Sequence, residues 1–400
     1  MSFRKSADIL KHAGIYVQCR ICGDELVPAG GFIKVGGALS FTPLGVVRAE
    51  SVNRFFAFDG QSVYVSADGK SFSYLNALAG DDPFVVEELE NGAARAAAVC
   101  GKNAVLHDGS SFVCREYGAN LKYGVMHSGR LFGADVEDGL ALRWSGAGGV
   151  CDWARGVQAS GYVRLDPERG EIIGINKLGD KLVAVRRFGL TVLSAYGNCE
   201  NFRVEATDTE CDDIYRGTAG VAGGRLWFCT VSGLKYFDGE RIRTLGHPLA
   251  KDVYSPESAV CFSDKYFLIC KSRFKGGKAV LCVDGDGESF IADAAASALC
   301  AADGLYAYCD DGVFKFGTGA RYELFADGVN FGSGGYKTLT GIFVDGSADI
   351  EISNGRVTRG FSGASGKIRP RLRGKNFCLR ITGDGAVRKI IAVAEVRNEL

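Results

Sequence analysis

The sequence predicts an all-β protein, and three observations on composition lead to this fold class. Among its 400 residues, 56 are glycine and only 7 are proline, while 25 Phe and 15 Tyr supply large apolar side chains. The glycines follow no three-residue period, which excludes a collagen-like chain. They fall between short aromatic and β-branched runs, where the turns of a strand-rich protein lie. The hydrophobic fraction of 46% is ample for a large folded core.

An internal repeat refines this fold class into an architecture. In each copy an apolar strand, a Gly/Asp turn and a second strand follow one another. The clearest copies pair a leading leucine with a glycine seven residues later: Leu182 and Gly189, Leu226 and Gly233, Leu305 and Gly312. Weaker copies lead with Phe55, Ala104, Leu131 and Tyr266. The copies are spaced by about 42 residues on average, the length of one four-stranded propeller blade.

The repeat predicts a β-propeller with six or seven blades, because radial stacking buries both faces of each four-stranded sheet. The interval between Ala104 and Leu131 is too short for four strands and predicts a trimmed blade. Residues 1–45 are expected to be an N-terminal β segment that docks on the ring or closes it, residues 46–325 the propeller, and residues 326–400 a basic C-terminal β appendage, either a sheet or a sandwich. Strands of the appendage are expected at residues 339–344, 349–353, 367–372, 377–382 and 390–396.

Charge is balanced over the whole chain, with 47 Lys and Arg against 47 Asp and Glu, so the chain has no net field that attracts nucleic acid or membrane. Residues 355–400 differ, because they contain 11 basic and 3 acidic residues. Cations stand there at alternate positions: Lys367, Arg369, Arg371, Arg373 and Lys375. In an extended strand the first four share one face, which suits DNA phosphates, an acidic partner or a neighbouring copy. The alternative is a charged edge strand that prevents sheet-to-sheet pairing.

Several Asp-Gly turns resemble the Asp-box turns of sialidase-like propellers, and the best of them spans residues 66–72. In such turns Asp and Ser side chains bond neighbouring backbone amides, so their role is structural. Structural turn residues are predicted at Asp68, Gly69, Gly189, Gly233 and Gly312. A glycosidase would need a carboxylate pair, or a Tyr/Glu nucleophile beside an arginine cluster, and no segment singles one out. We therefore predict no catalytic residues and no enzyme.

Most of the 14 cysteines lie inside apolar runs and are predicted to be buried structural thiols. Cys19 and Cys22 form the one close pair, whereas zinc usually needs a second pair at suitable spacing. No metal and no cofactor are expected, and metal binding at this pair stays the alternative. The acidic residues 208–213 lack the ligand offsets of a calcium loop and predict a solvated loop.

No run approaches the roughly 18 apolar residues of a membrane-spanning helix. The first residues also lack the apolar core of a secretory signal. We therefore expect no membrane span and synthesis in the cytoplasm.

Several segments resemble parts of the β-propeller virion proteins of tailed phages. They are residues 129–134, 142–146 and 151–153, the repeat copies at 173–193 and 225–239, and the ending at 371–381. The resemblance implies a structural role at the phage neck or tail, as a tail hub, a nozzle or a packaged-DNA stabilisation protein. It also implies a homo-oligomeric ring, typically a hexamer, that lacks catalytic residues. Its partners would be portal, adaptor or tail proteins, together with DNA.

The expected function is that of a non-enzymatic structural protein of a tailed phage or prophage-derived particle, located in the virion at the head–tail connection or in the tail assembly. Two alternatives stay open. A glycan-acting, sialidase-like propeller enzyme predicts a central pocket of clustered arginines and carboxylates. A propeller module that binds a surface glycan or protein predicts partner binding without particle association.

Overall fold

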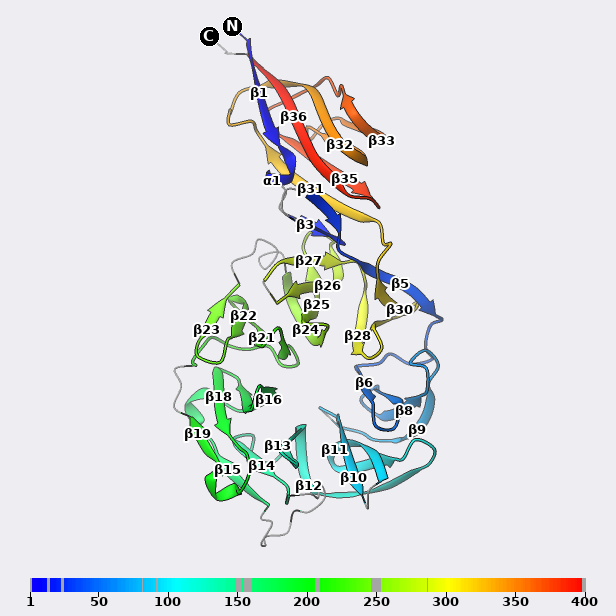
Figure 1. Cartoon of the computed structure of the whole chain (residues 1–400), viewed down its shortest axis with the longest axis vertical. Helices are drawn as coiled ribbons and strands as arrows, with labels where there is room; N and C mark the ends of the chain where they lie inside the picture. Colours follow the sequence, from blue (N-terminus) through cyan, green and yellow to red (C-terminus); the bar gives the residue numbers. More distant parts are fainter. Residues whose placement is uncertain are drawn as a thin grey trace.

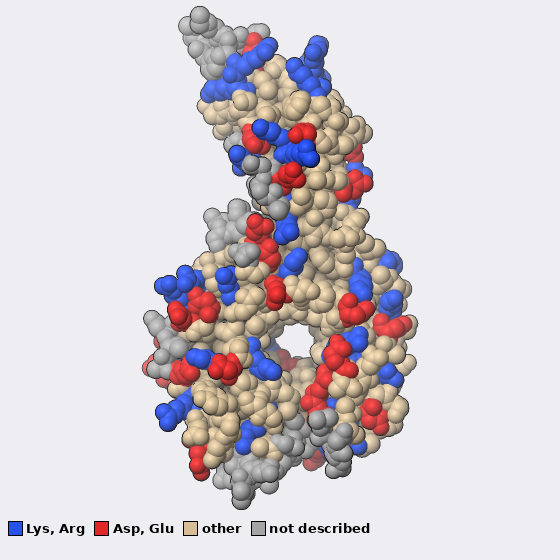
Figure 2. Space-filling model, in the orientation of Figure 1, with Lys and Arg blue, Asp and Glu red and all other residues tan. Residues whose placement is uncertain are grey.

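The computed structural model describes residues 2–12, 15–22, 25–80, 82–90, 93–147, 153, 160–205, 209–245, 253–285 and 287–397. Strands form a ring, and an elongated β unit that contains the first and the last strand projects from it (Figure 1). Figure 2 shows a hole through the middle of the ring. This all-β propeller arrangement confirms the predicted fold class. Among the described residues, no helix is long and apolar enough to cross a membrane.

Five separate antiparallel sheets form among the described strands of the ring. The first contains β6 (Gly45–Ala49), β7 (Arg54–Phe58), β8 (Ser62–Ser66) and β9 (Ser73–Ala77). The second contains β10 (Phe84–Glu90), β11 (Ala93–His107), β12 (Phe112–His127), β13 (Arg130–Asp135), β14 (Ala141–Trp144) and β15 (Gly161–Arg164). The third contains β16 (Ile172–Leu178), β17 (Lys181–Arg186), β18 (Gly189–Ser194) and β19 (Arg203–Glu205).

The fourth sheet contains β20 (Gly220–Ala222), β21 (Arg225–Thr230), β22 (Gly233–Phe237) and β23 (Ile242–Thr244). The fifth contains β28 (Ala296–Ala301), β29 (Leu305–Cys309), β30 (Gly312–Gly317) and the N-terminal strand β5 (Gly31–Gly36). Between these two sheets in the sequence lie β24 (Val253–Phe262), β25 (Lys265–Ser272), β26 (Gly277–Asp284) and β27 (Ser289–Ala292). Because β27 also pairs with β2 (Ile15–Val17), these four strands are continuous with the sheet of the projecting unit.

The separate ring sheets therefore number five, whereas the sequence predicted six or seven blades. The physical reason is that two long strands are shared. β11 and β12 span 15 and 16 residues, and the first half of each pairs with the strand before it while the second half pairs with the strand after it. Register shifts at residues 101–103 and 122–125 mark the change of partner. The trimmed interval between Ala104 and Leu131 is the stretch in which this sharing occurs.

The repeated glycines stand directly after two-residue turns. Arg186 pairs with Gly189, Thr230 with Gly233, and Cys309 with Gly312. At Gly189 the φ angle is +144° and an added Cβ would lie 2.4 Å from the carbonyl oxygen of Thr209. Only glycine fits this backbone without strain.

Among the described residues of the ring, seven clusters of buried apolar side chains each lie between one group of strands and the next. One of them joins Phe55 of the first sheet to Tyr306 and Tyr308 of the fifth, which brings the two ends of the ring together. Cys229 and Cys270 belong to another. Burial raises the pKa of the Cys229 thiol to about 12, so it stays neutral and packs as an apolar group.

The projecting unit is built from both ends of the chain. Its strands are β1 (Ser2–Asp8), β3 (Cys19–Cys22), β4 (Glu25–Pro28), β31 (Tyr322–Val329), β32 (Lys337–Ser353), β33 (Thr358–Ile368), β34 (Leu372–Gly374), β35 (Phe377–Gly383) and β36 (Val387–Arg397). The first half of β32 pairs with β36 and its second half with β35. Residues 339–344 and 349–353 are therefore parts of one strand, whereas two strands were expected.

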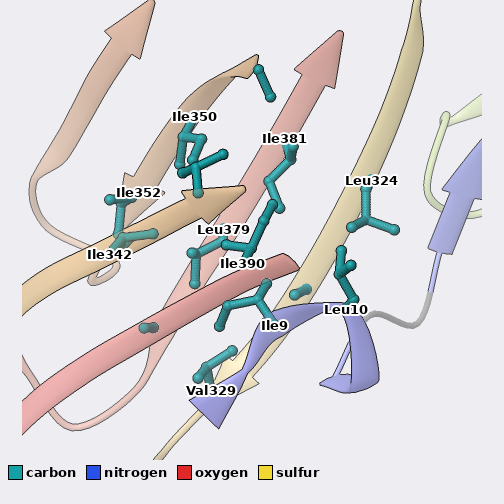
Figure 3. Close-up of a cluster of buried hydrophobic side chains, with 14 of the residues drawn as sticks. Ile9, Leu10, Leu324, Val329, Ile342, Ile350, Ile352, Leu379, Ile381 and Ile390 are labelled. Atoms are coloured by element: carbon teal, nitrogen blue, oxygen red, sulfur yellow. The ribbon is translucent and has the colours of Figure 1, made fainter. Parts of the chain in front are cut away.

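The core of the projecting unit lies between β32 and its partner strands β35 and β36. Ile342, Ile350, Leu379, Ile381 and Ile390 meet there (Figure 3). The helix α1 (Ile9–His12) adds Ile9 and Leu10 to this core. The other helical segments in the described part of the chain are the 3-10 turns η1 (Pro167–Arg169) and η2 (Cys199–Asn201) in the ring.

Residues 1–45 contact both parts of the molecule. β1 pairs along its whole length with β36 in the projecting unit, whereas β5 pairs with β30 in the ring. The first 36 residues thus contribute strands to both.

Candidate functional site

The basic stretch lies on one sheet of the projecting unit, but its backbone differs from the single strand expected at residues 367–372. β33 ends at Ile368 and β34 begins at Leu372, and both pair with β32. Between them Arg371 has a φ of +49°, a left-handed conformation that interrupts a strand. The guanidinium of Arg359 donates to the carbonyl oxygen of Pro370 at 2.7 Å and holds this break.

The five cations of the stretch are exposed. The residues between them, Ile368, Pro370, Leu372 and Gly374, are buried or half-buried. Within the part of the chain that the structure describes, none of the five makes an ion pair or donates a side-chain hydrogen bond. Their charge therefore faces solvent uncompensated.

In the ring, by contrast, many Lys and Arg side chains contact a carboxylate. Examples are Arg143 with Asp135 at 2.6 Å, Lys181 with Glu205 at 2.6 Å, Lys235 with Asp212 at 2.5 Å, Arg243 with Asp238 at 2.8 Å and Lys278 with Glu257 at 2.7 Å. Charges of both signs are interspersed over the ring surface in Figure 2. The five cations of the basic stretch thus lack a carboxylate partner among the described residues, although other cations of the projecting unit have one, such as Arg380 with Glu323 at 2.6 Å.

Four of the five cations fall into two groups. Arg373 and Lys375 lie over the ring of Tyr336, at 5.5 and 5.3 Å from its centroid. Lys367 and Arg369, together with Arg4 of β1, line a cavity with a volume of about 530 Å³. Cation–π contact keeps the first pair close to the surface of the sheet, and the second group surrounds a hollow.

The floor of this hollow is apolar. Phe343 on β32 and Ile391 and Val393 on β36 line it, and the Phe343 side chain is 49% exposed. Lys367 is opposite Phe343, and Phe343 is opposite Ile391 in register. Gly341 also lines the hollow, and an added Cβ there would lie 3.6 Å from Cε of Lys367. The missing side chain leaves the space between the cations and the apolar strands open.

Sequence reasoning identified Lys367 and Arg369 but missed Arg4, Phe343 and the two apolar residues of β36. Alternation of polar and apolar residues along β32 and β36 is a signal that a strand has a second face. Arg4 carries no such signal, because only the pairing of β1 with β36 brings it to this cavity.

The predicted turn residues lie in the ring, far along the chain from this cavity. Asp68 accepts hydrogen bonds from the amides of Lys70 at 2.9 Å and Ser71 at 3.0 Å. Gly69 has a φ of +70°, and its carbonyl oxygen accepts from the hydroxyl of Tyr308 at 3.0 Å. This turn thus connects the first sheet to the fifth.

The acidic loop also makes structural contacts in its described part, and Asp208 lies outside the described residues. Asp212 accepts from the amide of Ser232 at 2.8 Å and from Lys235 at 2.5 Å. Burial would raise the pKa of the Asp212 carboxyl, but these hydrogen bonds hold it well below its ordinary value of 3.8. The loop is therefore tied to the hairpin of β21 and β22.

We expect this contact to stabilise the ring in a pH-dependent way. A carboxyl with a lowered folded pKa contributes its full stability above its unfolded pKa, and the contribution is lost as the pH falls through the folded value. Asp212→Asn should therefore lower the melting temperature at about pH 6, and its difference from wild type should shrink toward about pH 3. Thermal unfolding followed by circular dichroism measures this, with exposed Asp310→Asn as the control. A difference that stays constant with pH would contradict the assignment.

A second cavity bears on the enzyme alternative. It has a volume of about 510 Å³ and contains Arg164, Arg169, Arg186 and four carboxylates. Residues of β15 and β19, the outermost strands of their sheets, line it (Figure 1). The cavity therefore differs from the central pocket that the enzyme alternative predicts. Arg186 is buried, and its guanidinium donates to the carbonyl oxygen of Asp166, to that of Gly170 and to the hydroxyl of Thr191. These donors hold the loop around η1.

The metal alternative at Cys19 and Cys22 gains no third ligand among the residues that the structure describes. Cys19 is buried in the core of the projecting unit, its thiol donates to the carbonyl oxygen of Glu323 at 3.4 Å, and burial raises its pKa to about 12. The Cys22 side chain lies outside the described part. Among the described residues, no group of three or more His, Cys, Asp or Glu side chains is placed to hold a metal ion. Cys151 and residue 152, which belong to the resemblance to virion proteins, also lie outside the described residues.

The sequence matches no protein-family model and no curated protein. Among solved structures, the chain is similar to PorZ, a surface component of the type-IX secretion system of Porphyromonas gingivalis, with 11% identity and a TM-score of 0.44. The match covers 82% of this chain and 46% of PorZ, so this chain spans about half the length of that protein.

Two further solved structures are similar. The N-terminal domain of Nup159 has 9% identity and a TM-score of 0.42, over 78% of this chain and 95% of that one. A quinoprotein alcohol dehydrogenase-like protein from Bacteroides thetaiotaomicron has 13% identity and a TM-score of 0.40, over 64% of this chain and 68% of that one. None of the three is described as a phage protein.

Proposed function

We propose that the chain is a seven-bladed propeller that acts as a non-enzymatic structural protein of a tailed phage or prophage-derived particle. Seven buried clusters around the ring support the blade number, because each blade of a closed ring packs against the next. In this view the six-stranded sheet contributes two blades and β24–β27 contribute one. The segments that resemble virion propeller proteins support the place in a particle.

The observation that carries the proposed contact role is the row of exposed cations on the projecting unit. Lys367, Arg369, Arg371, Arg373 and Lys375 make no ion pair among the described residues, whereas many ring cations do. Exposed, uncompensated positive charge attracts phosphates or acidic protein surfaces. The ring then serves as a platform that presents this unit to a portal, adaptor or tail protein, to another copy, or to DNA.

The test is to reverse three charges in induced particles. Arg369→Glu, Arg371→Glu and Arg373→Glu together should lower the nuclease-protected DNA per particle, or the amount of this protein that copurifies with particles, by about tenfold, because attraction becomes repulsion. Lys177→Glu, Arg203→Glu and Arg241→Glu on the ring make the same change in net charge and should leave both quantities near wild type. Normal DNA retention and normal incorporation of the first variant would overturn the contact role.

The other proposed functions have distinct outcomes. Mass photometry of the purified chain should show a homo-oligomer if the particle role is right, whereas a strict monomer absent from purified particles would contradict it. Turnover in a glycan-hydrolysis screen would favour the sialidase-like alternative. Binding to a glycan or surface protein without association with particles would favour the binding-module alternative.

A further inference from the structure

We infer that the hollow between Arg4, Lys367 and Arg369 binds a short acidic segment of a partner protein through an apolar anchor side chain. This inference rests on the proposed use of the projecting unit as a contact surface, and it deepens that proposal by naming the chemistry of the partner. The cavity has a volume of about 530 Å³, within the range of about 300–1,000 Å³ in which proteins hold ligands.

Charge around the rim is the first reason. Three cations line the hollow from two sides, Arg4 from β1 and Lys367 and Arg369 from β33 and the residue that follows it. No carboxylate lies within ion-pair distance of these three side chains among the described residues. Glu395 is opposite Arg4 in register, so Lys367 and Arg369 supply most of the uncompensated charge. The occupant should therefore carry carboxylates on the side toward β33.

The floor is the second reason, and it distinguishes a peptide from a nucleic acid. Ile391, Val393 and Phe343 present apolar surface between the cations. None of the three offers hydrogen bonds to base edges, and only Phe343 has a flat face on which a base stacks. An apolar side chain gains most by leaving water against them. The hollow thus matches an aliphatic or aromatic residue that has acidic neighbours in its own chain.

Glycine at position 341 is the third reason, because it keeps the hollow open. Its neighbours on β32 are Thr340, whose hydroxyl donates to the carbonyl oxygen of Val393 at 3.2 Å, and buried Ile342. A Cβ at Gly341 would make ordinary contact with Cε of Lys367. A larger side chain there should therefore fill the hollow and leave the three charges in place.

The experiment measures binding of a fluorescent peptide to the full chain by anisotropy at low salt. The probe alternates Glu with Leu and Phe. The first control is a peptide in which Ser replaces Leu and Phe. The second control is a duplex DNA of matched charge. Lys367→Gln with Arg369→Gln should weaken probe binding by about tenfold or more. Gly341→Val should weaken it comparably without any change of charge, and Arg371→Gln with Arg373→Gln should change it by less than about twofold.

Each outcome decides the inference. Loss of binding in both the charge variant and Gly341→Val, with native circular dichroism spectra, supports it. Equal binding of the Ser-containing peptide or of DNA would overturn it in favour of a purely electrostatic surface, and so would probe binding that Gly341→Val leaves unchanged. No binding of the probe to wild type also overturns it. The particle experiment shares only Arg369 with this one, and Gly341→Val belongs to the peptide experiment alone, so failure of the peptide inference and failure of the contact role can be told apart.

Discussion

Replacement of Trp227 by alanine is expected to lower the free energy of unfolding by about 3–5 kcal/mol, the cost of removing a large buried aromatic side chain. Trp227 is fully buried in the cluster between the fourth sheet and strands β24–β27. Its ring lies 4.8 Å from that of Tyr236 and 6.2 Å from that of Tyr266, centroid to centroid. Its indole nitrogen donates to the carbonyl oxygen of Ala222 at 3.2 Å. Alanine would leave a cavity and remove this hydrogen bond.

Denaturant unfolding followed by circular dichroism measures this effect without relying on tryptophan fluorescence. Trp227→Phe keeps most of the buried area and should cost clearly less than the alanine variant. Tyr196 is 62% exposed, so Tyr196→Ala should change the free energy of unfolding by no more than about 0.5 kcal/mol. A loss at Trp227 as small as that at Tyr196 would contradict the tight packing between these two groups of strands.

Gly189→Ala should be the second large effect, with a loss of about 3–4 kcal/mol. The backbone there has a φ of +144°, and the new Cβ would lie 2.4 Å from the carbonyl oxygen of Thr209. That oxygen accepts the amide of Leu190 at 3.0 Å, so it cannot move away without losing a hydrogen bond. The backbone strain at residue 189 and the loss of this hydrogen bond should both lower the free energy of unfolding.

Gly233 provides a matched control in the next hairpin. It follows the same two-residue turn and has a φ of +127°, but no atom lies within 4 Å of an added Cβ. Gly233→Ala should therefore cost only the conformational strain, about 1–2 kcal/mol. Denaturant midpoints of the two variants measure the difference. Equal losses would show that the approach of the Thr209 carbonyl has no energetic weight.

The hairpins were the most predictable part of the fold, because they depend on neighbours in sequence. Leu182 and Gly189 are seven residues apart, and this spacing sets a strand, a two-residue turn and a return strand. The blade count was less predictable. Whether β11 continues past Gly101 or turns back depends on which strand it meets in the folded ring, and its two halves meet different partners.

The candidate site was predictable in part. Alternation placed cations at Lys367, Arg369 and Arg373 on one side of buried neighbours, and the structure has these side chains exposed. The left-handed backbone at Arg371 was not predictable. The hydrogen bond that holds it joins the carbonyl of Pro370 to Arg359, which lies eleven residues earlier in the chain. The apolar floor also required the register of β32 against β36.

The sequence by itself determined the all-β class, the repeated hairpins and the excess of positive charge near the C-terminal end, because composition, short-range spacing and local charge are written in neighbouring residues. Only the tertiary structure decided how the strands divide into sheets and what surrounds Lys367 and Arg369. Arg4 reaches their cavity because β1 pairs with β36 and β36 with β32. The pairing of β1 with β36 joins residues more than 300 positions apart, and the hydrogen bonds and buried surface that select it form only when the whole chain has folded.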